Sequence, residues 1–143
     1  MDNILRSLLL TAQEVLLQGE HSCVVCDAGG MWRTSKEPGI RPVLRWLRED
    51  SQSLKEAVAA DKVVGRAAAM LFAHGGAKAL WAELISDAAL DFLAGTDIVY
   101  AYGARVPAIL NREGTSTCPM EERALRCETA AEAFEMFDKM IEK

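Results

Sequence analysis

The 143-residue chain has 50% hydrophobic and 26% charged residues, which is enough apolar material for a complete core and close to the usual size of one domain. We therefore expect a single domain over residues 1–143. The formal net charge of −5 and the lack of a Lys/Arg cluster argue against nucleic acid and anionic membranes as partners. Binding to phosphate backbones or headgroups needs a concentrated basic surface.

The first dozen residues carry neither a basic segment nor a long apolar run, since Leu8-Leu9-Leu10 is too short for a signal sequence or a membrane span. We expect a cytoplasmic protein.

The first half of the chain alternates helical and extended patterns. Residues 4–16 repeat apolar side chains at helical spacing, and residues 21–27 and 31–35 form a hairpin around Gly29-Gly30. Gly39-Ile40-Arg41-Pro42 then leads into a helix that runs to about Arg48, and Pro42 marks its start. A short strand over residues 57–60 then leads, through Asp61 as a helix cap, into an alanine-rich helix that ends at His74-Gly75-Gly76.

The second half continues this alternation. Residues 77–85 fit either a helix or a buried strand by propensity. Residues 86–93 predict a helix, 97–102 a strand, 106–110 an extended piece interrupted by Pro107, and 111–117 a loop. Helices follow over residues 118–127 and after the capping box at Thr129, with Phe134, Phe137 and Ile141 as the buried stripe of the last helix. This order predicts an α/β fold, a three-layer α-β-α sandwich around a mixed sheet of about five strands.

Metal-binding patterns are weak in this sequence. Cys23 and Cys26 lie three apart in a predicted strand, where they point to opposite faces, and no second CxxC follows. Neither His21 nor His74 belongs to a metal-binding spacing. We expect no metal and no other cofactor.

Cys118-Pro119-Met120-Glu121 predicts a helix that begins with a thiol. Pro119 suits the first helical position, and Glu121 is placed to reach back as a capping carboxylate. The positive end of the helix dipole favours the Cys118 thiolate, which would make it a nucleophile. The alternative is a capping turn with an inert cysteine.

Two other predicted helix starts carry groups suited to an anion. Asp61-Lys62-Val63-Val64-Gly65 follows a strand, where α/β sheets commonly bind ligands, and Lys62 could supply a cation or a proton. Gly65, interpreted as a residue of the helix interior, permits either tight helix–sheet packing or close approach of a ligand. Arg41, after Gly39, could bind a carboxylate or phosphate, or could form an ordinary surface ion pair. The polar turn at Asn111-Arg112 is either ligand-binding or a plain loop.

In combination, Gly39-Ile40-Arg41-Pro42, residues 60–69, Asn111-Arg112 and Cys118-Pro119-Met120-Glu121 resemble the family called domain of unknown function 1893. The resemblance covers nearly the whole chain. It implies a divergent cytidine deaminase-like fold, in which residues 77–85 form a strand and the two helix starts meet at one cleft.

Zinc deaminases place His/Cys-x-Glu at the first of these helix starts and Pro-Cys-x-x-Cys at the second. Here they carry Gly39-Ile40-Arg41-Pro42 and Asp61-Lys62-Val63-Val64-Gly65, which argues against zinc-dependent deamination. The leading hypothesis is binding of a small anionic or nucleotide-like ligand in that cleft by Arg41, Asp61 and Lys62. One alternative is a cysteine-dependent enzyme with Cys118 as nucleophile and Glu121 or Lys62 as proton carrier. Another is a non-catalytic module that forms a homodimer through a sheet edge or the C-terminal helices.

Overall fold

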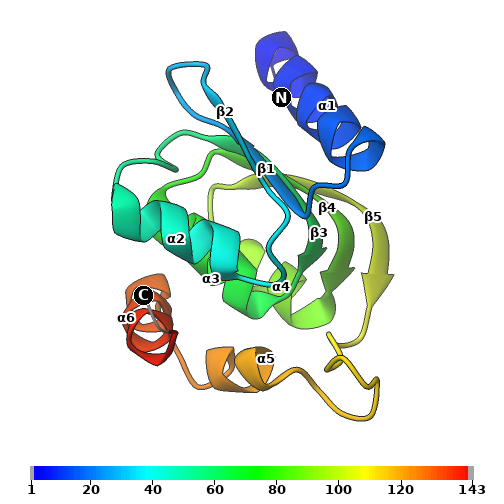
Figure 1. The fold of residues 1–143 in the computed structure, drawn as a ribbon, viewed down its shortest axis with the longest axis vertical. Coiled ribbons are helices and arrows are strands. Elements are labelled where there is room, and N and C mark those ends of the chain that lie inside the picture. The colour runs from blue at the N-terminus through cyan, green and yellow to red at the C-terminus, as the bar shows by residue number, and fades with distance from the viewer. Residues whose placement is uncertain (1, 142–143) are drawn as a thin grey trace.

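The computed structural model describes residues 2–141, and its elements follow the predicted order (Figure 1). In chain order they are α1 (Asn3–Gln18), β1 (Cys23–Cys26), β2 (Trp32–Ser35), α2 (Arg41–Glu49), β3 (Val58–Val64), α3 (Arg66–Gly75), β4 (Ala79–Ser86), α4 (Asp87–Leu93), β5 (Val99–Val106), α5 (Pro119–Ala124) and α6 (Ala130–Met140).

One mixed sheet of five strands, in the order β2-β1-β3-β4-β5, organises the described residues. β1 runs antiparallel to both β2 and β3, whereas β3, β4 and β5 are parallel to one another. The α/β prediction with a mixed five-stranded sheet is therefore confirmed. The ambiguous segment 77–85 is resolved as β4, a strand buried between two parallel neighbours.

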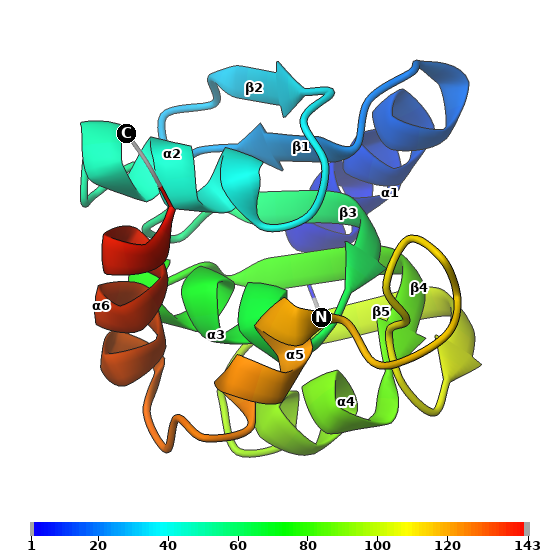
Figure 2. The same ribbon diagram turned by 60° about the horizontal axis from the view of Figure 1, so that its bottom comes forward.

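Helices cover both faces of the sheet. α1 lies alone on one face, where Leu5, Leu9 and Leu16 pack against β1, β3 and β4 (Figure 1). α2, α3 and α4 lie on the other face, and the short α5 and the C-terminal α6 pack against α3 (Figure 2). The larger of the two cores lies on this second face, around Phe72 and Phe137. The C-terminal helices thus cover α3 rather than the sheet itself.

The path from β3 to α3 differs from the prediction. β3 continues to Val64, because it pairs with β4 as far as Ile85, so Asp61 is a residue within the strand and not a helix cap. Gly65 is the N-cap of α3 and not part of its interior. Asp61 and Gly65 were therefore assigned the wrong local roles from sequence.

Smaller differences concern the segment after β5. The strand runs to Val106, beyond the predicted end at residue 102, so the extended piece predicted over residues 106–110 begins at the last residue of β5. This segment keeps a single bridge between Leu110 and Thr117. α5 ends at Ala124, three residues earlier than predicted, and Cys118 is its N-cap without a side-chain capping hydrogen bond. Glu121 therefore does not complete the predicted capping box with Cys118.

Candidate functional site

A groove of about 620 Å³ lies between α2 and α6. This volume is in the range of small-molecule sites. The residues that line it are Arg41, Leu44, Arg45, Leu47, Arg48, Glu49, Ser51, Phe134, Asp138 and Ile141. Leu44, Leu47, Phe134 and Ile141 provide apolar lining, and the arginines provide positive charge. The groove therefore combines an apolar surface with a cationic one.

The three arginines lie on the same side of α2, because positions 41, 45 and 48 are separated by four and three residues, which is close to one helical turn each. Two of them are engaged. Arg45 Nη2 lies 2.8 Å from Glu37 Oε2, in an exposed ion pair. Arg48 pairs with the Asp138 carboxylate and donates to the backbone carbonyls of Asp138 and Ile141. Arg48 thereby holds the C-terminal end of α6 against α2.

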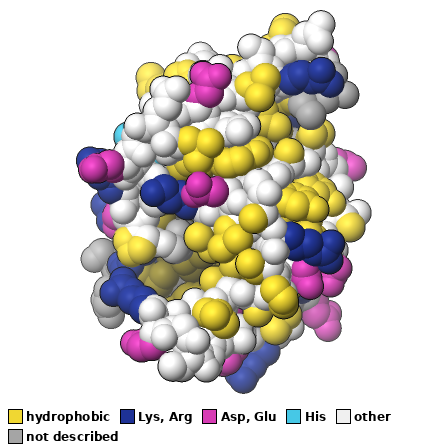
Figure 3. Space-filling view, turned by 90° about the vertical axis from the view of Figure 1, so that its right-hand side faces the viewer, with side chains coloured by type: hydrophobic (Ala, Val, Ile, Leu, Met, Phe, Trp, Pro, Cys, Tyr) yellow, Lys and Arg dark blue, Asp and Glu magenta, His cyan; other side chains and the backbone are white. Residues whose placement is uncertain are grey.

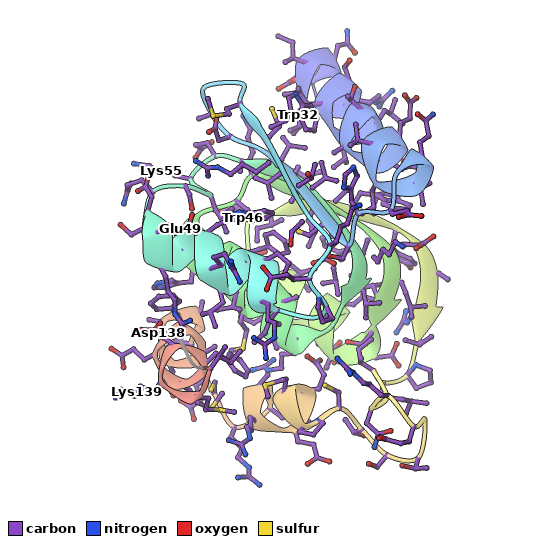
Figure 4. All side chains as sticks on the ribbon, viewed as in Figure 1. Trp32, Trp46, Glu49, Lys55, Asp138 and Lys139 are labelled. Atoms are coloured by element: carbon purple, nitrogen blue, oxygen red, sulfur yellow. The ribbon has the colours of Figure 1, made fainter. Side chains whose placement is uncertain are left out.

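Asp138 lies on the side of α6 nearest α2 (Figure 4). Glu49 is the last residue of α2. The Phe134 ring stacks on the His74 ring, with 4.6 Å between the two ring centroids. Arg41 is exposed at the first position of α2, and within residues 2–141 it forms no ion pair. Arg41 is thus a cation at the groove that these residues leave uncompensated.

The start of α3 is occupied by a side chain of the protein itself. The Glu121 carboxylate, on α5, accepts hydrogen bonds from the backbone N–H groups of Arg66 (2.6 Å) and Ala67 (3.1 Å). A Cβ on Gly65 would collide with this carboxylate. Glu121 is only 8% exposed, and burial raises its pKa although the two N–H groups act in the opposite direction. Glycine at position 65 therefore makes room for Glu121.

Arg66 completes this connection from the other side. Its guanidinium donates to the carbonyls of Ala124 (3.0 Å) and Cys127 (2.9 Å), at and just beyond the end of α5, and lies over the Phe92 ring. A carboxylate on α5 thus binds the start of α3, and a guanidinium on α3 binds the carbonyls at the end of α5. This reciprocal arrangement explains why α5 sits over the start of α3 in Figure 2.

Asp61 lies deep in the sheet, opposite Cys23 of β1. It is 4% exposed, and its Oδ2 has no hydrogen-bond partner among the described residues. Burial raises the pKa of Asp61 to about 7, against opposing hydrogen bonds from the Val63 and Lys62 N–H groups and Cys23. Burial also raises the pKa of the Cys23 thiol well above its usual range, and the Asp61 charge adds to this shift. Asp61 is a protonatable core residue rather than an accessible ligand contact in this conformation.

The other predicted site residues are spread out. Lys62 has an exposed side chain at β3, and Cys118 is half-buried at the start of α5. Gly39 adopts a left-handed conformation before α2, with φ of 64°. Asn111 binds Thr115 and Ser116 within its own loop, and Arg112 is exposed there.

Arg41 lines the α2–α6 groove, whereas Gly39, Asp61, Lys62, Gly65, Asn111 and Arg112 do not. The predicted catalytic roles of Cys118, Glu121 and Lys62 stay predictions, although the Glu121 carboxylate is already engaged by α3.

The model of the family described as domain of unknown function (DUF1893) matches residues 11–141. The chain belongs to the DUF1893 family. A solved DUF1893 family protein (TM1506) from Thermotoga maritima shares 24% identity over 95% of this chain and 91% of its own, with a TM-score of 0.85. At this identity the likeness shows the fold. A comparison with curated proteins gives no match.

A cytidine deaminase-like fold would place a metal at the starts of α2 and α3, and the residues present in this DUF1893 protein do not fit one. The α2 start offers Arg41, and the α3 start offers backbone N–H groups that a carboxylate already fills. The Arg41 guanidinium repels a cation, and the Glu121 carboxylate is engaged by the α3 N–H groups, so neither start offers the imidazole or thiolate ligands that zinc prefers. Within residues 2–141, no group of three or more His, Cys, Asp or Glu side chains is arranged to hold a metal ion. The helices described are also too short or too polar to cross a bilayer.

Several groove residues of this DUF1893 protein were missed from sequence. Arg45 and Arg48 follow Arg41 at helical spacing, so the positive side of α2 was visible in the pattern. Phe134 and Ile141 were assigned to a buried stripe, yet both are only partly buried and line the groove. No local signal placed α6 beside α2, because that contact joins residues about ninety positions apart.

Proposed function

We propose that this DUF1893 protein binds a small organic anion with an apolar or aromatic body, of a nucleotide-like kind, in the α2–α6 groove. The observation that carries the proposal is Arg41, a cation left uncompensated by residues 2–141, beside an apolar lining. Guanidinium groups recognise carboxylates and phosphates through paired hydrogen bonds. The apolar lining suits the body of the ligand.

The charges around the groove support an anion over a cation. Three arginines line it against two acids, and one of these acids, Asp138, is already paired with Arg48. Glu37, which pairs with Arg45, is not a lining residue. A bound anion would therefore meet Arg41 first and Arg45 second.

We also propose the fold as a divergent, zinc-free branch of the cytidine deaminase-like folds. The order of helices around the mixed sheet supports this proposal, and so does a groove along α2 that includes Arg41 at the start of this helix. A cytoplasmic location is proposed as well, supported by the buried unpaired thiols of Cys23, Cys26 and Cys127, since reducing compartments keep thiols free.

A thermal-shift screen against organic anions tests the ligand proposal, with Arg41→Ala compared with Arg112→Ala as the matched control. Both arginines are exposed, but only Arg41 lines the groove. We expect a ligand that raises the melting temperature of the wild type and of Arg112→Ala, and that loses most of this effect in Arg41→Ala. Equal stabilisation of Arg41→Ala and wild type by every active ligand would reject the groove as the site.

A further inference from the structure

The charges that line the α2–α6 groove are sorted along its length. Arg41 is the first residue of α2 and Glu49 is the last, so about 12 Å of helix rise separates their backbones. Both residues line the groove, and so do Leu44 and Leu47, which lie between them in α2. The groove therefore has a basic end and an acidic end with an apolar middle.

Ion pairing within the protein leaves the two end charges uncompensated. Arg48 pairs with the Asp138 carboxylate, and its Nη2 also donates to the carbonyls of Asp138 (2.5 Å) and Ile141 (2.6 Å). Glu49 is exposed and, like Arg41, forms no ion pair within residues 2–141. An unpaired cation and an unpaired anion thus remain at opposite ends of α2.

The backbone of α2 adds to this polarity. Its N-cap residue, Ile40, provides no side-chain cap, so the free N–H groups of the first turn add positive potential beside Arg41. At the other end the last carbonyls carry partial negative charge, and Glu49 adds to it, because Arg48 of the same turn is engaged by α6. The Ser51 hydroxyl also lines this end. The acidic end therefore favours a positively charged group.

Opposite charges are arranged differently on the β5 side of the molecule. Figure 3 shows that basic and acidic side chains are intermingled there, around patches of hydrophobic side chains. Arg105 of β5, for example, pairs with Asp87 at the start of α4. The separated and unpaired charges of the groove contrast with that arrangement.

We propose that the ligand of the groove is amphoteric, with an anionic group bound by Arg41 and a protonated amine bound by Glu49, on either side of a flat apolar body. This inference rests on the proposed function, because it takes the groove as the binding site. Each charged end of the ligand supplies the partner that Arg41 or Glu49 lacks within residues 2–141, through charge-assisted hydrogen bonds.

The lining between the two ends indicates the chemistry of the body. Phe134 lines the groove, and its ring is stacked on the His74 ring, so it offers a rigid aromatic surface to a second flat ring. The ligand class is thus an aromatic anion with an amine on the far side of the ring. α-Amino acids do not fit, because their ammonium and carboxylate groups are joined to the same carbon atom.

Two probes of the same shape test this class by NMR titration of the ¹⁵N-labelled protein at low ionic strength. 4-(Aminomethyl)benzoate carries a carboxylate and an ammonium group across a ring, and 4-ethylbenzoate has a methyl group in place of the ammonium. We expect the wild type to bind the amine at least about threefold more tightly, a modest ratio because the carboxylate of Glu49 is exposed. Arg41→Ala should weaken the binding of both probes.

Substitutions at Glu49 test which residue recognises the amine. Glu49→Gln should bind the two probes equally and keep the wild-type affinity for 4-ethylbenzoate. Glu49→Lys should reverse the preference and bind terephthalate more tightly than the amine, which a merely structural role of Glu49 would not produce. Glu135→Gln is the matched control, because Glu135 is an exposed glutamate on α6 that does not line the groove, and it should keep the wild-type preference.

The outcomes separate this inference from the proposed function. Equal affinity of the wild type for both probes, with both weakened by Arg41→Ala, would overturn the amphoteric class and leave the groove as an anion site. A preference for the amine that survives Glu49→Gln would overturn the assignment to Glu49. Failure of both probes, while other organic anions stabilise the protein in the thermal-shift screen, would also overturn the inference. Failure of every organic anion would overturn the proposed function itself.

Discussion

The starts of α2 and α3 carry similar local signals, yet the structure treats them differently. Neither has a side-chain cap from its own N-cap residue. The α3 start is filled by Glu121, whose carboxylate binds the N–H groups of Arg66 and Ala67. The α2 start carries Arg41, which faces a groove of about 620 Å³ and has no ion-pair partner within residues 2–141.

This difference shows that a local pattern for anion binding is decided by segments far away in the chain. Glu121 is 55 residues from Arg66 and supplies the anion that the α3 start favours. At α2 the distant segment is α6, which builds a wall of a groove instead of filling the helix start. One site is therefore closed by the fold, whereas the other is left open.

The largest expected effect concerns Asp61, in the strand that leads to the α3 start. Its pKa is about 7 in the folded chain against an ordinary value of 3.8, so the folded state holds the proton more tightly than the unfolded state does. The free energy of unfolding should therefore fall as the pH rises from about 4 to 7, by up to about 4 kcal/mol, and should fall no further from this cause above pH 7.

Urea unfolding at a series of pH values measures this dependence, and Asp61→Asn, which carries no titrating group, should remove most of it. Asp91→Asn is the matched control because Asp91 is exposed on α4, and it should keep the wild-type profile. A wild-type profile as flat as that of Asp61→Asn would show that Asp61 is not buried in the way described.

Gly65→Ala is expected to cause the next largest change in the free energy of unfolding, because it disrupts the contact of Glu121 with the start of α3. The added Cβ would collide with the Glu121 carboxylate and push it away from the Arg66 and Ala67 N–H groups. We expect a loss of about 2–3 kcal/mol in the free energy of unfolding, from overpacking and the lost cap. Gly29→Ala, where a Cβ would make an ordinary contact, should change stability by less than about 0.5 kcal/mol.

Glu121→Ala is expected to cost about 1–2 kcal/mol, because it leaves two N–H groups of α3 without their acceptor. A double-mutant cycle sharpens the result. In the Glu121→Ala background, Gly65→Ala should cost clearly less than in the wild type, since the colliding group is absent. Additive costs in denaturant unfolding would mean that Gly65 does not serve Glu121.

Arg41→Ala is expected to have the smallest effect on folding and the most specific effect on binding. Arg41 is exposed and forms no ion pair within residues 2–141, so the free energy of unfolding should change by less than about 0.5 kcal/mol. Isothermal titration of an anion that binds the wild type should show at least tenfold weaker binding. A large loss of stability with unchanged affinity would assign Arg41 a structural role.

Hydrophobic periodicity, glycine turns and capping residues are local signals, and they predicted every element except β4, for which only the family resemblance favoured a strand over a helix. The sequence-based prediction misplaced Asp61 and Gly65, because the length of β3 is set by pairing with β4 and not by the polar Asp61-Lys62 pair. It identified Glu121 as a capping residue but assigned it to the wrong helix.

The sequence indicated only those parts of the candidate site that carry a local signal. Arg41 was recognised from its place before Pro42, and it lines the groove. Phe134 and Asp138 could not be assigned to the site, because only the tertiary packing of α6 against α2 brings them there. Local sequence therefore indicated the cation of the site but not its walls.

The most direct test of the open and closed helix starts is an NMR titration of the uniformly ¹⁵N-labelled protein with AMP, with inorganic phosphate as the control and a panel of organic acids alongside. The account predicts saturable shifts of amides lining the groove, around Arg41, Leu44 and Phe134, from at least one organic anion, and little change at residues 65–67. Saturable shifts centred on residues 65–67 and Glu121, or none from any anion in the panel, would contradict it.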